Sequence, residues 1–134
     1  MPIGPGTFSG SRALDPVRNY RAYADVVVTD PTGMTRSSTI QCLVDTGSDY
    51  TVLPMSMATA VGIVPSGLPV TFRTAAGVSY SLPSHPTVDL IVEGYRINTP
   101  VAFSTAASFI PILGRLEAVA AFDIGFDVAN WYWD

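Results

Sequence analysis

The sequence predicts an all-β domain with one or two short helices. Runs of β-branched and aromatic residues are short and recur along the chain, turn-forming Gly, Pro, Asp and Ser separate them, and few segments carry a helical pattern. A chain of 134 residues is long enough for one domain with a core of its own. We therefore expect a closed or folded β architecture.

The N-terminal segment differs from the rest of the chain in composition. Residues 1–19 are rich in Gly, Pro and Ser and have no apolar period, which predicts a flexible arm before a domain over residues 20–134. The first residues lack the basic start and apolar run of a secretory signal, and no apolar run approaches the roughly 18 residues of a membrane span. We expect a cytoplasmic protein without a membrane span.

Between residues 19 and 62, the sequence predicts a hairpin, a further strand and a helix. Residues 30–33 (DPTG) place Pro and Gly at the positions that a β-turn favours. The helix has Pro54 near its start and Gly62 at its end. The expected elements are a strand over 19–29, its return over 34–44, a strand over 51–53 and a helix over 54–62.

The second half of the chain is expected to consist mainly of hairpins. Small residues at 74–77 separate two β runs, and residues 93–95 (EGY) separate two more. Residues 131–133 (WYW) fit either a dimer interface, where aromatic residues are enriched, or the core of one chain. The expected elements are hairpins over 70–82 and 87–103, a strand over 110–113, helical turns over 115–121 and a strand region over 123–133.

The most informative segment is residues 43–48 (LVDTGS). A strand that runs into an acidic residue on a tight Gly turn presents one carboxylate, that of Asp45, at the end of a rigid element. The Asp-Thr-Gly tripeptide occurs once in the chain, whereas a pair of reacting carboxylates needs two copies. One half-site per chain predicts a homodimer with a two-fold axis through a shared site.

Residues 112–115 (ILGR) follow this segment, with a flap-like hairpin between the two. In this order of elements the chain resembles the retropepsin-like aspartic proteases, a single-lobed family that includes retroviral proteases and bacterial relatives. The resemblance spans roughly residues 20–128 and implies a closed β-barrel with one flap hairpin per chain, a homodimer and a peptide or protein substrate. The Ala-rich composition, with Arg and no Lys, is compatible with a bacterial member.

The resemblance also implies roles for individual residues. Asp45 would be the catalytic aspartate, Thr46 would brace the opposite loop across the two-fold axis, and the backbone of Gly47 would lie along the substrate. Gly114 would pack behind the Asp45 loop, and Arg115 would form an ion pair with Asp49 that holds this loop. The residues implied to line the substrate site are Leu43, Ser48, Asp49, Val52, Ala75, Ala76, Gly77, Ile110 and Ile112.

A pair of nearby carboxyl groups suits peptide hydrolysis. Two such groups cannot both ionise easily, so they share a proton; the ionised partner takes a proton from water, and the protonated partner donates to the scissile carbonyl. This chemistry needs neither cofactor nor metal. Cys42 and His85 are single, so we expect no thiolate zinc cage and no His-rich metal site. A net charge of −4 without an Arg cluster argues against nucleic-acid binding.

Other interpretations stay open at this point. A catalytically silent member would use its cleft or dimer surface for binding, a different hydrolase would use Ser84 and His85, and a β-barrel interaction module would carry the motifs by coincidence. The Ser84–His85 pair lacks the nucleophile-elbow pattern. Ser48 stands where retroviral members usually have Ala, so we hypothesise that its hydroxyl bonds to one carboxyl and favours the ionised form. Tyr50 replaces a common acidic residue, so substrate specificity does not transfer.

Overall fold

The computed structural model describes residues 10–73, 75–106, 108–126 and 129–134. This part of the chain is mostly β-strand with only short helices, α1 (Met55–Ala60) and the 3-10 turn η2 (Val119–Ala121), which confirms the all-β class. The strands are β1 (Gly10–Ala13), β2 (Tyr23–Thr29), β3 (Ile40–Val44), β4 (Thr51–Pro54), β5 (Val70–Arg73), β6 (Ser79–Leu82), β7 (Ser84–Val92), β8 (Tyr95–Ser104), β9 (Ile112–Leu113), β10 (Ile124–Phe126) and β11 (Asn130–Trp133).

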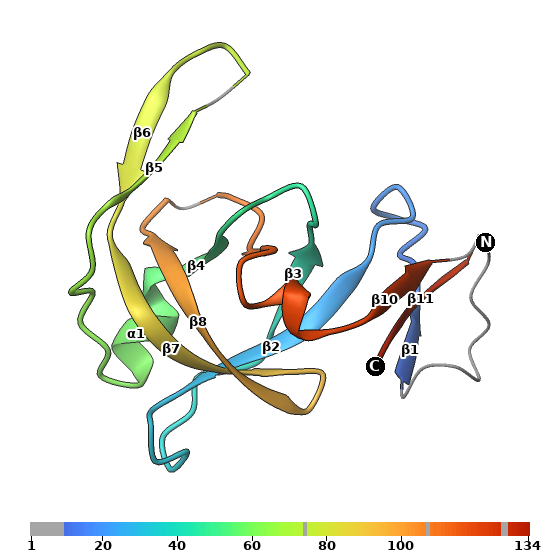
Figure 1. Cartoon of the computed structure of the whole chain (residues 1–134), viewed down its shortest axis with the longest axis horizontal. Coiled ribbons are helices and arrows are strands. Elements are labelled where there is room, and N and C mark those ends of the chain that lie inside the picture. The colour runs from blue at the N-terminus through green and yellow to red at the C-terminus, as the bar shows by residue number, and fades with distance from the viewer. Residues whose placement is uncertain (1–9, 74, 107, 127–128) are drawn as a thin grey trace.

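Six strands pair in a ring around the core (Figure 1). Their order is β2-β3-β9-β4-β8-β7, and β7 returns to β2 through an antiparallel ladder. β9 lies parallel to β3, with Leu43 opposite Ile112 and Val44 opposite Leu113. Two segments that are far apart in the sequence therefore lie side by side at the point where the Asp45 loop begins.

Alternation of side chains explains why β2 forms a wall of the core. Ala24, Val26 and Val28 are fully buried, whereas Asp25 and Val27 between them are only partly buried. Every second side chain of a strand lies on the same face, so this pattern directs one face of β2 inward. The largest fully buried side chains of the other barrel strands are Phe103, Leu53, Leu90 and Leu113.

The helix predicted over residues 54–62 is α1, and residues at its two ends explain its limits. Pro54 is the N-cap and has an extended conformation. Gly62 lies just beyond the helix with a φ of +75°, an angle that glycine adopts at little cost. Met57 and Ala58 bury one side of α1 against the core. No helix in the described ranges is long and apolar enough to cross a membrane.

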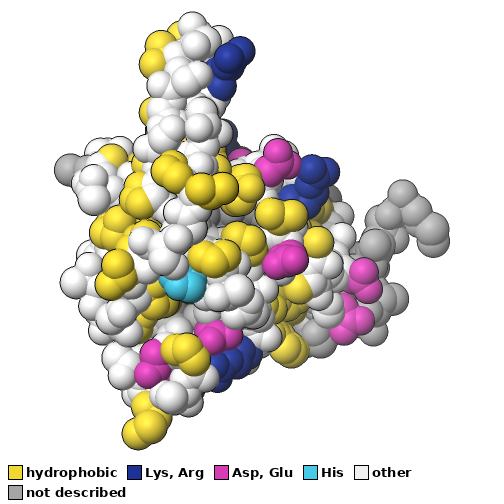
Figure 2. All heavy atoms as spheres, turned by 60° about the vertical axis from the view of Figure 1, so that its left-hand side comes forward, with side chains coloured by type: hydrophobic (Ala, Val, Ile, Leu, Met, Phe, Trp, Pro, Cys, Tyr) yellow, Lys and Arg dark blue, Asp and Glu magenta, His cyan; other side chains and the backbone are white. Residues whose placement is uncertain are grey.

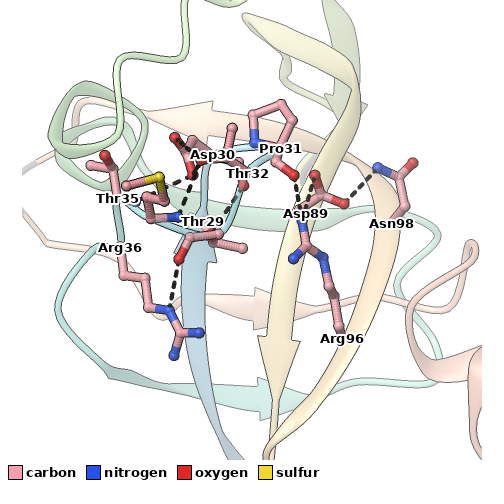
Figure 3. A network of polar contacts seen from close by, with 11 residues as sticks. Thr29, Asp30, Pro31, Thr32, Thr35, Arg36, Asp89, Arg96 and Asn98 are labelled. Carbon is pink, nitrogen blue, oxygen red and sulfur yellow. Dashed lines mark hydrogen bonds and ion pairs between the residues drawn. The ribbon is translucent and has the colours of Figure 1, made fainter.

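The turn after β2 is present where residues 30–33 predict it, and the β7–β8 hairpin holds it in place (Figure 3). The Asp30 carboxylate accepts a hydrogen bond from the Thr32 hydroxyl at 2.9 Å. Arg96 of β8 donates to the Pro31 carbonyl at 2.9 Å and lies 3.4 Å from the Asp89 carboxylate of β7. The turn therefore has local support and support from the neighbouring strands.

The β5–β6 hairpin forms where residues 70–82 predict it and projects from the barrel (Figures 1 and 2). Gly77 lies near its tip with a φ of +83°, and Ala75 and Ala76 beside it are exposed. Hydrophobic side chains gather where the projecting part joins the body of the molecule (Figure 2). The second predicted hairpin, over residues 87–103, is formed by β7 and β8.

The second half of the segment that is expected as a flexible arm, residues 1–19, contains the strand β1. β1 pairs antiparallel with β11, and Gly10 lies opposite Trp133. A Cβ at Gly10 would lie 2.3 Å from the Trp133 ring, so this position needs glycine. The composition does not reveal β1 because its partner strand lies at the other end of the chain. Residues 1–9 lie outside the described residues.

Residues 15–21 form a compact turn that is held by Arg18. The Arg18 Nε donates to the Asp15 carboxylate at 2.7 Å, and an Nη donates to the Gln41 side chain at 2.6 Å. The guanidinium also lies 3.4 Å over the ring of Tyr23, a favourable cation–π arrangement. The hydrogen bond from Arg18 is the main cause that lowers the pKa of the Asp15 carboxyl. The turn is thus fixed against β2 and β3.

The strand region expected over residues 123–133 consists of two strands rather than one. β10 and β11 pair antiparallel, with Ile124 opposite Trp133, and together with β1 they form a three-stranded sheet beside the barrel (Figure 1). Trp131, Tyr132 and Trp133 are 2%, 3% and 8% exposed. These aromatic side chains therefore pack within their own chain. This agrees with the interpretation that residues 131–133 belong to the core of one chain.

Candidate active site

The Asp45 loop begins where β3 ends, and backbone groups hold its conformation. The Asp45 N–H donates to the Leu113 carbonyl at 3.1 Å, and the Asp45 Oδ1 accepts from the Gly47 N–H at 3.0 Å. The Ser48 N–H donates to the Asp45 carbonyl at 3.2 Å. Asp45 is partly exposed, and Thr46 and Gly47 are exposed. The loop thus presents a carboxylate on a fixed turn that is accessible from outside.

The segment that follows β9 packs directly behind this loop. Gly114 is buried, and its N–H donates to the buried Oγ1 of Thr51 at 2.9 Å. A Cβ at Gly114 would lie 2.3 Å from the carbonyl carbon and oxygen of Tyr50, so only glycine fits at this distance. The Arg115 N–H donates to the Ser48 carbonyl at 2.7 Å. Backbone contacts therefore join two segments that are distant in the sequence.

An ion pair lies on the outer side of the same loop. Arg115 approaches the Asp49 carboxylate at 2.9 Å, and the two side chains are 65% and 71% exposed. Exposed ion pairs contribute only about 0–1 kcal/mol to stability. The Leu116 N–H also donates to the Asp49 carbonyl at 2.9 Å. The backbone contacts, more than the ion pair, keep the loop in place.

The residues expected to line a substrate site lie on two parts of the molecule. Leu43 and Val52 both face Ile112 across neighbouring strands, so these three residues meet at the end of β3. Ile110 lies just before β9 and is 52% exposed. Ser48 and Asp49 lie in the Asp45 loop. The remaining expected lining residues occupy the tip of the projecting β5–β6 hairpin: Ala75, Ala76 and Gly77.

Asp45 also lines a hollow of about 380 Å³ that the sequence does not predict. Tyr20, Arg21 and Phe126 line this hollow. Tyr20 and Phe126 are 62% and 48% exposed, so each leaves apolar surface uncovered beside the carboxylate. No local sequence signal marks these residues, because only the 15–21 turn and the terminal sheet bring them to Asp45.

Among the residues that the structure describes, no three His, Cys, Asp or Glu side chains are grouped as metal ligands. Cys42 is fully buried; burial raises the pKa of its thiol to about 12, and the negative charge of Asp25 acts in the same direction. Because the thiolate is the form that ligates metals and attacks carbonyls, Cys42 is inert at neutral pH.

A comparison with protein families agrees with this geometry. A family model described as aspartyl protease matches residues 31–115, which is more than half of the chain. The chain belongs to the aspartyl protease family. This family is of the retropepsin type, which confirms the resemblance seen in the sequence. The match includes the Asp45 loop, the β5–β6 hairpin and β9, and it leaves out β1, β2, β10 and β11. A comparison with curated proteins found no match.

In this aspartyl protease domain, the Ser48 hydroxyl braces the Asp45 loop. It donates a hydrogen bond to the Tyr50 carbonyl at 3.0 Å. A hydroxyl has a single proton to donate, so in this arrangement it does not donate to the Asp45 carboxylate. The single chain therefore does not support the hypothesis that Ser48 stabilises an ionised carboxyl by donating to it.

Proposed function

We propose that this protein is an aspartic endopeptidase that hydrolyses peptide bonds as a homodimer. The observation that carries the proposal is the accessible Asp45 carboxylate on a fixed Asp-Thr-Gly turn in a chain of the aspartyl protease family. Each chain supplies one such carboxylate. A two-fold axis beside Asp45 brings two of them together in one site.

Water is the nucleophile in this mechanism. The two Asp45 carboxyls hold one proton between them, because two negative charges at short distance repel each other. The ionised carboxyl takes a proton from water as the water oxygen attacks the scissile carbonyl carbon, and the other carboxyl donates its proton to the carbonyl oxygen. The C–N bond of the tetrahedral intermediate then breaks, and the leaving amine takes the proton that the first carboxyl received from water. A hydroxyl of the intermediate returns its proton to the second carboxyl as the product carboxyl group forms, which restores the shared proton.

The surrounding residues take supporting roles in the proposed dimer. Thr46 and Gly47 are exposed next to Asp45 and so are accessible to a partner chain and a substrate. In the proposed dimer, Thr46 braces the loop of the partner chain and the Gly47 backbone lies along the substrate. An extended peptide adds as a strand below the β5–β6 hairpin, whose tip closes over it. The apolar walls of the substrate site are Leu43, Val52, Ile110 and Ile112.

A digest of a peptide mixture, read by mass spectrometry, tests this proposal. Wild type and Asp45→Asn are compared from about pH 3.5 to 7.5, because the mechanism needs one protonated carboxyl. We expect cleavage by wild type alone, and a specific activity that falls on dilution as the dimer dissociates. Cleavage that survives in Asp45→Asn would place the chemistry on another residue. No cleavage under any condition would favour a binding module with this fold.

A further inference from the structure

The β5–β6 hairpin has one apolar face and one polar face. Phe72 lies opposite Tyr80 in the ladder, and Val70 lies opposite Leu82. The alternate positions are polar, and the hydroxyls of Thr71 and Ser81 hydrogen-bond to each other at 3.1 Å. Since successive side chains of a strand point to opposite faces, the hairpin is a two-sided ribbon whose faces differ in chemistry.

The apolar face of the hairpin meets the loop that carries Asp45. The ring of Phe72 stacks on that of Tyr80 with centroids 5.5 Å apart and planes 18° apart. The ring of Tyr50 meets Phe72 edge to face, with centroids 6.4 Å apart and planes 74° apart. We refer to Tyr50, Phe72 and Tyr80 as the aromatic cluster. It connects the hairpin to the segment that leaves the Asp45 loop.

The structure fixes Tyr50 more firmly than its position in a loop suggests. Its carbonyl accepts the hydrogen bond from the Ser48 hydroxyl at 3.0 Å. Its carbonyl group also packs against Gly114, where no Cβ fits, and the next residue, Thr51, begins β4. A ring on so constrained a backbone is a stable platform, whereas Phe72 and Tyr80 lie on the projecting hairpin.

The cluster leaves ring surface uncovered. Tyr50 and Phe72 are half-buried, and Tyr80 is 47% exposed. Aromatic surface of this kind packs favourably against another ring or a large apolar side chain. A peptide that lies extended below the hairpin directs every second side chain to the same face, so it can place one of them on the cluster.

We propose that the aromatic cluster determines substrate specificity: it binds an aromatic or large apolar side chain of the peptide. This inference rests on the proposed peptidase function and names the kind of substrate that the site prefers. Tyr50 supplies the part of this surface that lies beside the Asp45 loop, and Phe72 and Tyr80 supply the part that lies on the projecting hairpin.

The experiment uses peptide pairs that differ at one position. The digest of a peptide mixture by wild type first identifies the substrate position at which a ring is preferred, and matched peptides with Phe or Ala at that position then give two values of kcat/KM. We expect wild type to favour Phe by roughly tenfold, the order of an aromatic contact. Tyr50→Ala should bring the ratio near one, and Tyr50→Phe, which keeps the ring, should preserve it.

Tyr95→Ala is the matched control. The ring of Tyr95 meets Phe122 edge to face at 6.1 Å and 76°, much as Tyr50 meets Phe72, but it lies at the β7–β8 turn. Its removal should leave the Phe/Ala ratio unchanged. Phe72→Leu is the second test variant, because it removes a ring from the projecting hairpin and leaves the Asp45 loop intact; it should lower the ratio as well.

The outcomes separate this inference from the function on which it rests. Peptide cleavage without a ring preference, or a preference that Tyr50→Ala and Phe72→Leu both retain, would overturn the specificity role and leave the peptidase in place. If wild type cleaves nothing under conditions in which it is folded and dimeric, both proposals fail. A loss of preference in the two variants, with cleavage of the Ala peptide retained, would support the cluster as the specificity surface.

Discussion

Gly114→Ala tests whether close backbone packing fixes the Asp45 loop. The added Cβ would lie 2.3 Å from the carbonyl carbon and oxygen of Tyr50 and 2.8 Å from the nitrogen of Thr51. Carbon atoms in contact are normally about 3.5 Å apart, so the two segments must separate by about 1 Å. All three facing atoms belong to the backbone, and no side-chain rotation relieves the clash. The change must therefore strain the loop itself.

The size of the effect follows from two contributions. Overpacking at a tight site costs about 1–3 kcal/mol, and the rigid neighbours of Gly114 place it near the upper value. Separation also weakens the 2.9 Å hydrogen bond from the Gly114 N–H to Thr51. A typical intramolecular hydrogen bond contributes about 1 kcal/mol. We expect the free energy of unfolding to fall by about 3–4 kcal/mol in total.

Urea unfolding at one fixed protein concentration measures this loss. With a slope of about 1.5 kcal/mol per M, the midpoint should fall by roughly 2 M. Gly62→Ala is the control: Gly62 has a φ of +75° but no atom within 4 Å of the added Cβ. It carries only the backbone cost of a left-handed residue, about 1–2 kcal/mol. A midpoint shift for Gly114→Ala no larger than that for Gly62→Ala would refute the packing argument.

Three further predictions concern other parts of the fold. Thr51→Val removes the buried acceptor of the Gly114 N–H and should lower the free energy of unfolding by about 1–3 kcal/mol. Thr51→Ser keeps the hydroxyl and should lower it less. Equal losses of stability for the two variants in thermal denaturation would contradict this prediction. The pKa of the Asp15 carboxyl is lower in the folded state than in the unfolded state. The ionised carboxyl therefore stabilises the fold at pH values above its unfolded pKa of about 3.9, and this stabilisation is lost as the pH falls through the folded pKa. The carboxyl of Asp15 should therefore titrate below that of an unfolded peptide by NMR, and Arg18→Ala should return it toward the peptide value; an unchanged midpoint would count against the contact. The thiol of Cys42, whose pKa is raised to about 12, should not react with a thiol reagent at pH 8 in the native protein. It should react after the protein has been unfolded in urea. Rapid labelling of Cys42 in the native protein would show that β3 opens.

The elements that the sequence predicts well are those whose signals are local. Pro54 and Gly62 mark α1 directly, and residues 30–33 carry the preferences of a turn. The Asp-Thr-Gly tripeptide is also local, and a loop with one accessible carboxylate follows from it. Hairpins were predictable for the same reason, because each brings together neighbouring runs across a short turn.

Features that depend on distant partners were not predictable in this way. The sequence of β1 has no alternation of apolar and polar residues that would predict a strand. β1 forms because it pairs with the edge of β11 and because Gly10 leaves room for the Trp133 ring. The hollow beside Asp45 depends on the same sheet, since it is lined by Tyr20 of the 15–21 turn and Phe126 of β10. A single sequence shows such residues as isolated aromatics, and only the folded chain reveals that they are neighbours.

The pairing of β1 with β11 has a consequence for the order in which the chain is assembled during synthesis. All six barrel strands lie between Tyr23 and Leu113, so the barrel can close before β10 and β11 have been translated. β1 is translated before the barrel strands and can pair only after β11 has been made, at a rate of about 5–20 residues per second. The ring of Trp133 can pack against Gly10 only after β11 has been translated. Burial of that tryptophan therefore reports that the β1-β11-β10 sheet has formed.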